Sequence, residues 1–350
     1  MQATAAVFHS SGRPLELTKV SLPTLADGEV LVKIDCCTLC GSDLHSISGA
    51  RQVPIPSILG HEILGHVQEV VGDVRDVDGN AVNVGDRVVW SVAASCGECF
   101  FCTIGPVQKC ESLFKYGHEE FRDNHPLSGG LATHCHLAAG TAIVQVPDDL
   151  SDVVACPSSC ATATVAAALR TAGDVDGRTV VIHGAGMLGL TAAAMLRSNG
   201  ATNVVVSDLD EVRAQRAKQF GATHVSLDGL ADLSNGRGAD IVLDMSGSPD
   251  AMESSLELLR VGGRLILVGA VFPARPLRMQ ADQLVRKMLR VEGVHNYESG
   301  DLQTAVRFLL EAGSDFPFAS LVDREFSLSD VNAAVQETHD SGAFRVAVRP

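Results

Sequence analysis

Four cysteines lie within fifteen residues of one another in a C-x2-C-x2-C-x7-C pattern, at Cys96, Cys99, Cys102 and Cys110. Zn²⁺ favours thiolate ligands, and four thiolates complete its tetrahedral geometry. An iron-sulfur cluster is the alternative, but the spacing fits the usual ferredoxin patterns poorly. Because protein ligands would fill all four positions, the pattern predicts a structural zinc that stabilises a lobe with little core of its own.

A second set of potential ligands is scattered along the chain. Cys40 begins Cys-Gly-Ser-Asp-Leu-His, His61 and Glu62 lie in Gly-His-Glu-Ile-Leu-Gly, and Cys160 follows Pro157. Taken alone, a cysteine or histidine of this kind is more often a core residue than a ligand. Together, two thiolates and one imidazole match a catalytic zinc site whose fourth position is open, with Glu62 as an occasional ligand or an orienting charge.

A glycine motif points to nucleotide binding. Gly184-Ala185-Gly186-Met187-Leu188-Gly189 follows the apolar run 179–182 and opens a predicted helix. Gly184 allows a tight turn, Gly186 lets the backbone approach a pyrophosphate, and Gly189 lets helix and strand pack closely. The backbone N–H groups of this motif and the following helix N-terminus, including those of Met187 and Leu188, suit phosphate binding. The alternative is a glycine turn without a ligand.

Asp208 ends the next apolar run, 203–206, at the spacing of the acidic residue in the dinucleotide fingerprint. A carboxylate there accepts hydrogen bonds from ribose hydroxyls and repels a 2′-phosphate, which predicts NAD rather than NADP. Arg213 is close enough in sequence to weaken this preference.

The elements that must position these residues change in character along the chain. Residues 1 to about 150 are rich in short β-branched runs, and Asp78-Gly79-Asn80 predicts a hairpin turn. From about residue 153, a helix over 161–172 is followed by alternating apolar runs and helices, which predicts a parallel sheet with crossover helices. The predicted strands are 29–34, 66–71, 86–90, 141–146, 179–182, 203–206, 240–244, 264–268, 289–294 and 344–348. The predicted helices are 187–198, 211–220, 251–259, 301–313 and 329–339.

Composition limits the function classes. The chain has 350 residues, 46% of them hydrophobic, which suits one large or two ordinary globular domains. Its net charge of −15 disfavours nucleic acid and anionic membrane surfaces as partners. Without an export signal or a long apolar run, we expect a cytoplasmic protein whose ten cysteines are reduced and available as ligands.

These motifs, in this order, resemble the zinc-dependent medium-chain alcohol dehydrogenases over essentially the whole chain. The resemblance rests on the Cys40 hexapeptide, Gly60-His61-Glu62, Val84-Gly85-Asp86-Arg87-Val88, the four-cysteine lobe, Cys160 and the glycine motif. It implies an α/β protein with a GroES-like β-rich catalytic domain at 1–153 and 294–350. It further implies a Rossmann domain, a doubly wound parallel sheet, at 154–293, and a homodimer or homotetramer that pairs near 289–294.

The resemblance also implies residue roles. Cys40, His61 and Cys160 would be the catalytic zinc ligands, Asp43 would orient His61, and Ser42 and His45 would relay a proton. Thr164 would abut the nicotinamide, and Arg345 would contact the pyrophosphate and Glu62. The implied reaction passes a hydride between a small-molecule alcohol or its carbonyl and NAD, with two zinc ions in each chain.

The substrate is less constrained by the sequence. Lys115, His118 and Arg51 are candidates to bind a polar or anionic alcohol, although a solvated loop is the simpler interpretation. The segment 110–119 resembles dehydrogenases associated with phosphonate metabolism, which suggests a hydroxyalkyl phosphonate. A polyol or amino-polyol is the alternative. A zinc-free quinone or enone reductase, or a non-catalytic binding protein on this fold, would not need the complete ligand set.

Overall fold

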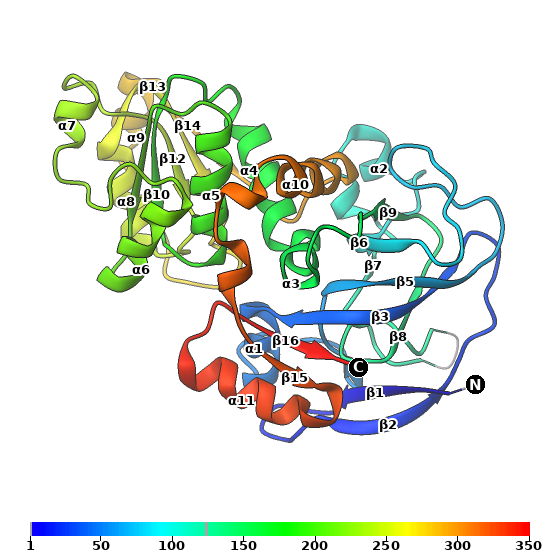
Figure 1. Ribbon diagram of the computed structural model, residues 1–350. Helices are drawn as coiled ribbons and strands as arrows, with labels where there is room; N and C mark the ends of the chain where they lie inside the picture. The colour runs from blue at the N-terminus through cyan, green and yellow to red at the C-terminus, as the bar shows by residue number, and fades with distance from the viewer. Residues whose placement is uncertain (1, 123–124) are drawn as a thin grey trace. The chain divides into compact units, whose positions relative to one another are not determined.

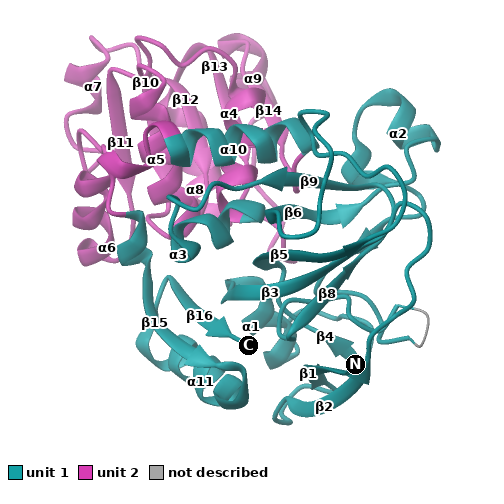
Figure 2. Ribbon diagram, turned by 45° about the vertical axis from the view of Figure 1, so that its right-hand side comes forward, with its two compact units in different colours: residues 1–160, 298–310, 318–350 teal, residues 161–297, 311–317 magenta. Residues whose placement is uncertain are grey.

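The computed structural model describes residues 2–122 and 125–350, which form two compact units. Unit 1 contains residues 1–160, 298–310 and 318–350, and unit 2 contains residues 161–297 and 311–317 (Figures 1 and 2). The domain boundaries expected after residues 153 and 293 stay predictions.

Unit 2 is built on a five-stranded parallel sheet in the order β11-β10-β12-β13-β14 (Figure 1). Its strands are β10 (Thr179–His183), β11 (Asn203–Ser207), β12 (Ala239–Asp244), β13 (Leu259–Leu267) and β14 (Arg290–Gly293). Its helices are α4 (Ala161–Ala172), α5 (Met187–Ser198), α6 (Glu211–Arg216), α7 (Leu230–Leu233), α8 (Pro249–Leu258) and α9 (Ala281–Lys287). The order reverses at β10, and ligands of such sheets bind at the carboxyl ends of the strands beside the reversal.

Unit 1 is mainly antiparallel β structure. One sheet has the order β15-β16-β3-β5-β6-β7, with β8 also paired to β3 and β9 to β6, and a smaller sheet has the order β2-β1-β4. The larger sheet contains β3 (Val30–Leu39), β5 (Glu62–Val70), β6 (Arg87–Ala94), β7 (Phe114–Lys115), β8 (His134–Leu137), β9 (Thr141–Gln145), β15 (Val322–Ser327) and β16 (Arg345–Arg349). The smaller sheet contains β1 (Gln2–Phe8), β2 (Glu16–Ser21) and β4 (Ser57–Ile58).

The helices of unit 1 are short and lie mostly at strand ends: α1 (Gly41–Ser48), α2 (Phe100–Ile104), α3 (Asp152–Ala155), α10 (Ser299–Glu311), whose last residue belongs to unit 2, and α11 (Val331–Ser341). The core of the unit includes Trp90 and Tyr116, whose rings meet edge to face at 6.3 Å. β16 pairs with β3, so the last strand belongs to the same sheet as the strand that directly precedes Cys40.

Most predicted elements are present, with two corrections. Residues 211–220 are not one α-helix: α6 ends at Arg216 and a 3-10 helix continues to Phe220 before Gly221, which has φ +87°. The hairpin expected at 78–80 is wrong as a strand connection, because the turn at Gly79 closes only an isolated bridge between Arg75 and Ala81.

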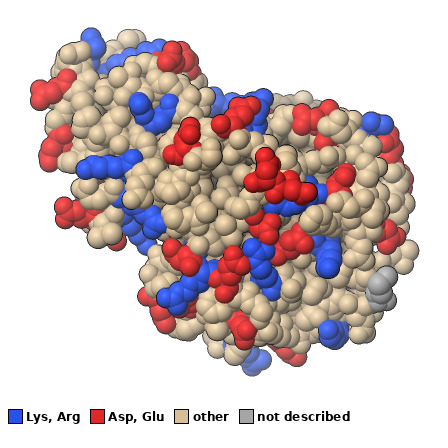
Figure 3. Space-filling model, viewed as in Figure 1, with Lys and Arg blue, Asp and Glu red and all other residues tan. Residues whose placement is uncertain are grey.

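Acidic and basic side chains are interspersed over the face that Figure 3 shows. Among residues 2–122 and 125–350, no single helix has the length and apolar character of a membrane span. One helix pair bent by 53°, 152–159 with 161–172, meets these criteria by length and composition together, and most of its residues are buried as in a core helix.

Candidate functional site

Three potential metal ligands that are distant in sequence converge in unit 1. Cys40 directly follows β3 and is the N-cap of α1, His61 directly precedes β5, and Cys160 follows the 3-10 helix 156–159. Their ligand atoms all lie within 4.8 Å of one another. Two sulfurs and one imidazole nitrogen are donors that Zn²⁺ prefers, and together they leave a fourth tetrahedral position open. The donor set therefore fits a catalytic zinc.

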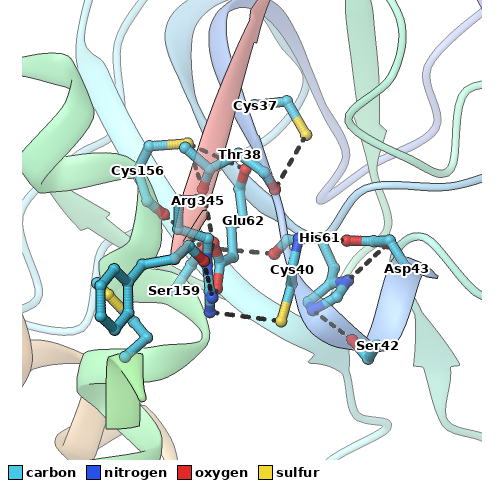
Figure 4. A network of polar contacts seen from close by, with 12 residues as sticks. Cys37, Thr38, Cys40, Ser42, Asp43, His61, Glu62, Cys156, Ser159 and Arg345 are labelled. Atoms are coloured by element: carbon cyan, nitrogen blue, oxygen red, sulfur yellow. Dashed lines mark hydrogen bonds and ion pairs between the residues drawn. The ribbon is translucent and has the colours of Figure 1, made fainter. Parts of the chain in front are cut away.

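Asp43 connects two of these ligands (Figure 4). Its Oδ2 accepts the backbone N–H of Cys40 at 2.9 Å, and its Oδ1 accepts that of Gly60 at 3.1 Å. The same Oδ1 lies 3.3 Å from His61 Nδ1, an ion-pair contact in which the ring N–H is not aligned as a hydrogen bond. The carboxylate is 1% exposed. Asp43 thus holds both ligand segments and leaves His61 Nε2 to face the site.

A second buried carboxylate lies behind the ligands and is paired with an arginine (Figure 4). Arg345 donates from Nε and Nη2 to the two oxygens of Glu62, each at 2.7 Å, and Thr38 Oγ1 donates to Glu62 Oε2 at 2.6 Å. Arg345 Nη2 also lies 3.4 Å from Cys40 Sγ. Glu62 is not among the three residues whose ligand atoms converge. Its role as an occasional zinc ligand stays a prediction, as does the contact of Arg345 with pyrophosphate.

The charges of this cluster favour a bound cation. Burial by itself lowers the pKa of His61, but the charge and side-chain contact of Asp43, with Cys40, raise it to about 10. The contact between the two sulfurs lowers the pKa of Cys40 and raises the pKa of Cys160, as expected for two thiols close enough to bind one ion. Zn²⁺ would supply positive charge between the two sulfurs and the imidazole.

Ser42 and His45 lie three residues apart in α1 and therefore share one side of the helix. Ser42 Oγ is 3.2 Å from His61 Nε2, whereas His45 is exposed. The helix thus carries one polar side chain at the ligands and another toward solvent, and the relay role of the two residues stays a prediction.

The four-cysteine lobe is a second candidate metal centre. The ligand atoms of Cys96, Cys99, Cys102 and Cys110 also lie within 4.8 Å of one another. Backbone N–H groups donate to three of the sulfurs, including that of Glu111 to Cys99, and this hydrogen bond contributes most to lowering the pKa of Cys99 to about 6. Phe100 and Ile104 of α2 are 61% and 58% exposed, so the lobe has little core of its own. These features fit a structural zinc.

The glycine motif joins β10 to α5 in unit 2. Gly184 has φ +100°, and a Cβ at Gly189 would lie 1.8 Å from the Gly184 carbonyl oxygen. A Cβ at Gly186, the N-cap of α5, would meet open space. Met187 is buried and Leu188 half-buried in the first turn. Two glycines are thus required by the turn itself, and the third leaves room for a phosphate.

Asp208 ties the neighbouring strand end to this turn. Its Oδ2 accepts the backbone N–H of Ala185 at 2.6 Å, and its Oδ1 accepts that of Asp210 at 2.8 Å. Arg213 lies on α6, with its Nε 3.7 Å from Asp210 Oδ2. Thr164 is half-buried in the first turn of α4. The cofactor roles of these residues remain predictions.

A third group, Glu29, His125 and His136, was not anticipated from sequence. His136 Nε2 contacts Glu29 at 2.9 Å, but the rings of His125 and His136 are stacked at 3.8 Å with an interplanar angle of 16°. A metal must lie close to the plane of each imidazole that binds it, and near-parallel planes do not meet at one such point. This group is therefore a hydrogen-bonded cluster rather than a metal centre in this arrangement.

The family models and known relatives agree with this geometry. Residues 26–148 match the alcohol dehydrogenase GroES-like domain, and residues 188–311 match the zinc-binding dehydrogenases. L-threonine 3-dehydrogenase of Escherichia coli K12 is 30% identical over 325 residues, which is 90% of each chain. An alcohol dehydrogenase structure from Thermotoga maritima has a TM-score of 0.94 and 29% identity, with full coverage of both chains.

A zinc-binding dehydrogenase structure from Sinorhizobium meliloti, bound to NADP, has a TM-score of 0.86 and full coverage. At 24% identity it supports the fold alone. The predicted fold class, a GroES-like β-rich domain with a Rossmann-type parallel sheet, is confirmed.

Proposed function

Since this chain belongs to the zinc-dependent medium-chain alcohol dehydrogenases, we propose that it interconverts a polar secondary alcohol and its ketone with NAD as the hydride carrier. The observation that carries this proposal is the convergence of Cys40, His61 and Cys160. Their ligand atoms lie within 4.8 Å of one another, although Cys40 and Cys160 are far apart in the sequence. A zinc-free reductase or a non-catalytic binding protein on this fold would not need these three ligands.

Zinc bound by Cys40, His61 and Cys160 would act as a Lewis acid that makes an alcohol oxygen more acidic. Bound NAD would accept the hydride at its nicotinamide ring. Asp43 keeps His61 oriented through Nδ1. Ser42 Oγ, at the ligands, would take up the alcohol proton as it releases its own hydroxyl proton toward His45, which would pass a proton to solvent. Arg345 donates to both oxygens of Glu62 and so compensates that buried negative charge.

The cofactor preference rests on Asp208. Its carboxylate lies at the end of β11 beside the glycine turn, where it suits ribose hydroxyls and repels a 2′-phosphate. We therefore propose NAD as the physiological cofactor. We also propose a structural zinc at Cys96, Cys99, Cys102 and Cys110, a cytoplasmic location and a homodimer or homotetramer.

The names of the relatives favour one chemical class of alcohol as the substrate. The E. coli enzyme is named for L-threonine, an amino acid with a secondary hydroxyl group, which favours a polar alcohol of that kind. A polyol or amino-polyol is the second candidate. A hydroxyalkyl phosphonate would be an alcohol that carries an anionic group.

Purified protein should contain two zinc ions in each chain and should reduce NAD with at least one member of a panel of hydroxy acids, polyols and simple alcohols. Cys160→Ser should lose one zinc ion and the activity, whereas Cys102→Ser should lose the other zinc ion and resistance to proteolysis near 96–110. Activity that survives in metal-free protein would overturn the proposal.

A further inference from the structure

Arg51 is held beside the metal ligands by α1. The helix begins at its N-cap Cys40 and ends at Gly49, which has φ +82°. The Arg51 backbone N–H then donates to the carbonyl oxygen of His45 at 2.9 Å, which fixes the chain against the helix end. Arg51 is thus attached to the same short helix that carries Cys40, Ser42 and His45.

Lys115 reaches the same ligands from another part of unit 1. It pairs with Ala93 between β7 and β6, and the His118 N–H donates to the Lys115 carbonyl oxygen at 3.1 Å to close a turn. Gly117 in this turn lies against Gly60: a Cβ at residue 117 would come within 2.7 Å of the Gly60 oxygen. His118 packs its ring 5.2 Å from that of His61. The turn is therefore fixed to the residue before a zinc ligand.

The electrostatic environment of the two cations agrees with the backbone contacts that bring their segments to the ligands. Arg51 interacts with Asp43 and with the sulfurs of Cys40 and Cys160. Lys115 interacts with Arg51 and with Cys160, and burial followed by the Arg51 charge lowers its pKa to about 8. The bond of Arg51 to the end of α1 and the packing of the Lys115 turn on Gly60 therefore place both residues next to the segments that carry the ligands.

Neither cation has a partner of its own. Among residues 2–122 and 125–350, no hydrogen bond or ion pair is formed by the Lys115 ammonium or the Arg51 guanidinium, and both residues are half-buried. Removing two like charges from water without a carboxylate in hydrogen-bonding contact costs free energy. A solvated loop would leave them exposed instead. The arrangement becomes favourable when an anion binds between them.

We propose that Arg51 and Lys115 form an oxyanion subsite of the substrate pocket, so that the substrate is an alcohol bearing a carboxylate or a phosphonate near its hydroxyl group. The proposal rests on the proposed function. Next to this subsite, His118 Nδ1 contacts the Tyr116 carbonyl oxygen at 2.9 Å. In the neutral ring this contact assigns the proton to Nδ1 and leaves Nε2 to accept a hydrogen bond from a substrate hydroxyl or ammonium group.

Binding can be tested without turnover. Inorganic phosphate and acetate, added separately to the zinc-loaded protein, should raise the thermal unfolding midpoint by about 2 °C at saturation. The increase should disappear in the double variant Arg51→Gln/Lys115→Gln. It should persist in Arg75→Gln/Lys33→Gln, whose side chains lie on the surface of the same unit. An equal response of wild type and the Arg51/Lys115 double variant would overturn the proposal.

Kinetics with matched substrates identify the anion. L-threonine and 2-hydroxypropylphosphonate carry a carboxylate and a phosphonate, and L-threonine amide and butane-2,3-diol lack an anion. In Arg51→Gln and in Lys115→Gln, KM for the preferred anionic alcohol should rise about tenfold to a hundredfold with little change in kcat. KM for the neutral alcohols should change little. Whichever of these two anionic substrates the wild-type enzyme prefers identifies the recognised group as a carboxylate or a phosphonate.

Two results would contradict the subsite and leave the proposed function intact. In the first, the Arg51 and Lys115 variants raise KM equally for neutral and anionic alcohols. In the second, they raise KM for NAD and leave KM for the alcohol unchanged. The second result would assign the cations to a cofactor phosphate. If wild type oxidises no alcohol on the panel, the proposed function fails, and the anion-binding measurement still tests the subsite.

Discussion

The guanidinium of Arg345 holds both carboxylate oxygens of Glu62 at 2.7 Å across 283 residues of sequence (Figure 4). Glu62 is fully buried and Arg345 is 6% exposed. The contact joins the last strand to the strand that follows His61, and it brings Arg345 to 3.4 Å from the Cys40 sulfur. The end of the chain thus stabilises the ligand segments.

Removing one member of this pair should leave an uncompensated buried charge. We expect Arg345→Met to lower the free energy of unfolding by about 3–5 kcal/mol. Adding Glu62→Gln to that variant should recover part of the loss, because the orphaned charge is then gone. Urea unfolding of the two single variants and the double variant measures this coupling. Additive losses would show that the pair is not coupled.

The proposed proton relay depends on His45. We expect His45→Ala to lower kcat by about a hundredfold in weakly buffered solution, because the exposed end of the path is lost. Added imidazole should restore part of the rate, and the zinc content should equal that of wild type. Turnover that does not change, or that imidazole does not rescue, would exclude His45 from the relay.

Asp208 should decide the cofactor. Asp208→Gly removes both the acceptor for ribose hydroxyls and the charge that repels a 2′-phosphate, so the ratio of kcat/KM for NAD to that for NADP should fall about tenfold or more. Asp210→Ser is a matched control, because serine preserves the N-cap of α6. An unaltered ratio in Asp208→Gly would show that Asp208 does not contact the ribose.

His125 should contribute to the loss of folding stability at acidic pH. Burial, followed by the charge of His136, lowers the pKa of His125 from 6.5 to about 4. Between these values the unfolded chain binds more protons than the folded chain, so the free energy of unfolding falls as pH decreases from 6.5 to 4. His125→Gln keeps a donor for the His136 carbonyl oxygen but does not titrate. Its unfolding free energy, measured by urea titration, should depend less steeply on pH. An identical slope would contradict this assignment.

The sequence predicts best what depends on neighbouring residues. β10 is a short strand with an apolar centre whose five residues are all buried, and Gly184 and Gly189 meet local steric demands that the motif encodes. The four cysteines of the lobe converge because a few residues separate them. The Cys40, His61 and Cys160 set was recognisable from ligand chemistry and from the family resemblance, and not from spacing.

The remainder depends on tertiary contacts. Thr38 bonds Glu62 only because β3 and β5 pair in the register that places them opposite one another. The helix α1 begins with Gly-Ser-Asp, which has low helix propensity. Its start is fixed by the side chain of Asp43, which accepts the N–H of the N-cap residue Cys40, and its end by Gly49 at the C-cap. The position of Lys115 beside the ligands follows from packing of Gly117 on Gly60. Sequence periodicity carries no signal for such contacts.

The central claim is that Cys40, His61 and Cys160 bind one zinc ion. A crystal structure of the purified enzyme with anomalous data at the zinc edge tests it most directly. We predict two anomalous peaks in each chain, one coordinated by the two sulfurs and His61 Nε2 and the other by the four-cysteine lobe. A single peak at the lobe, with no metal among Cys40, His61 and Cys160 in active enzyme, would contradict the account.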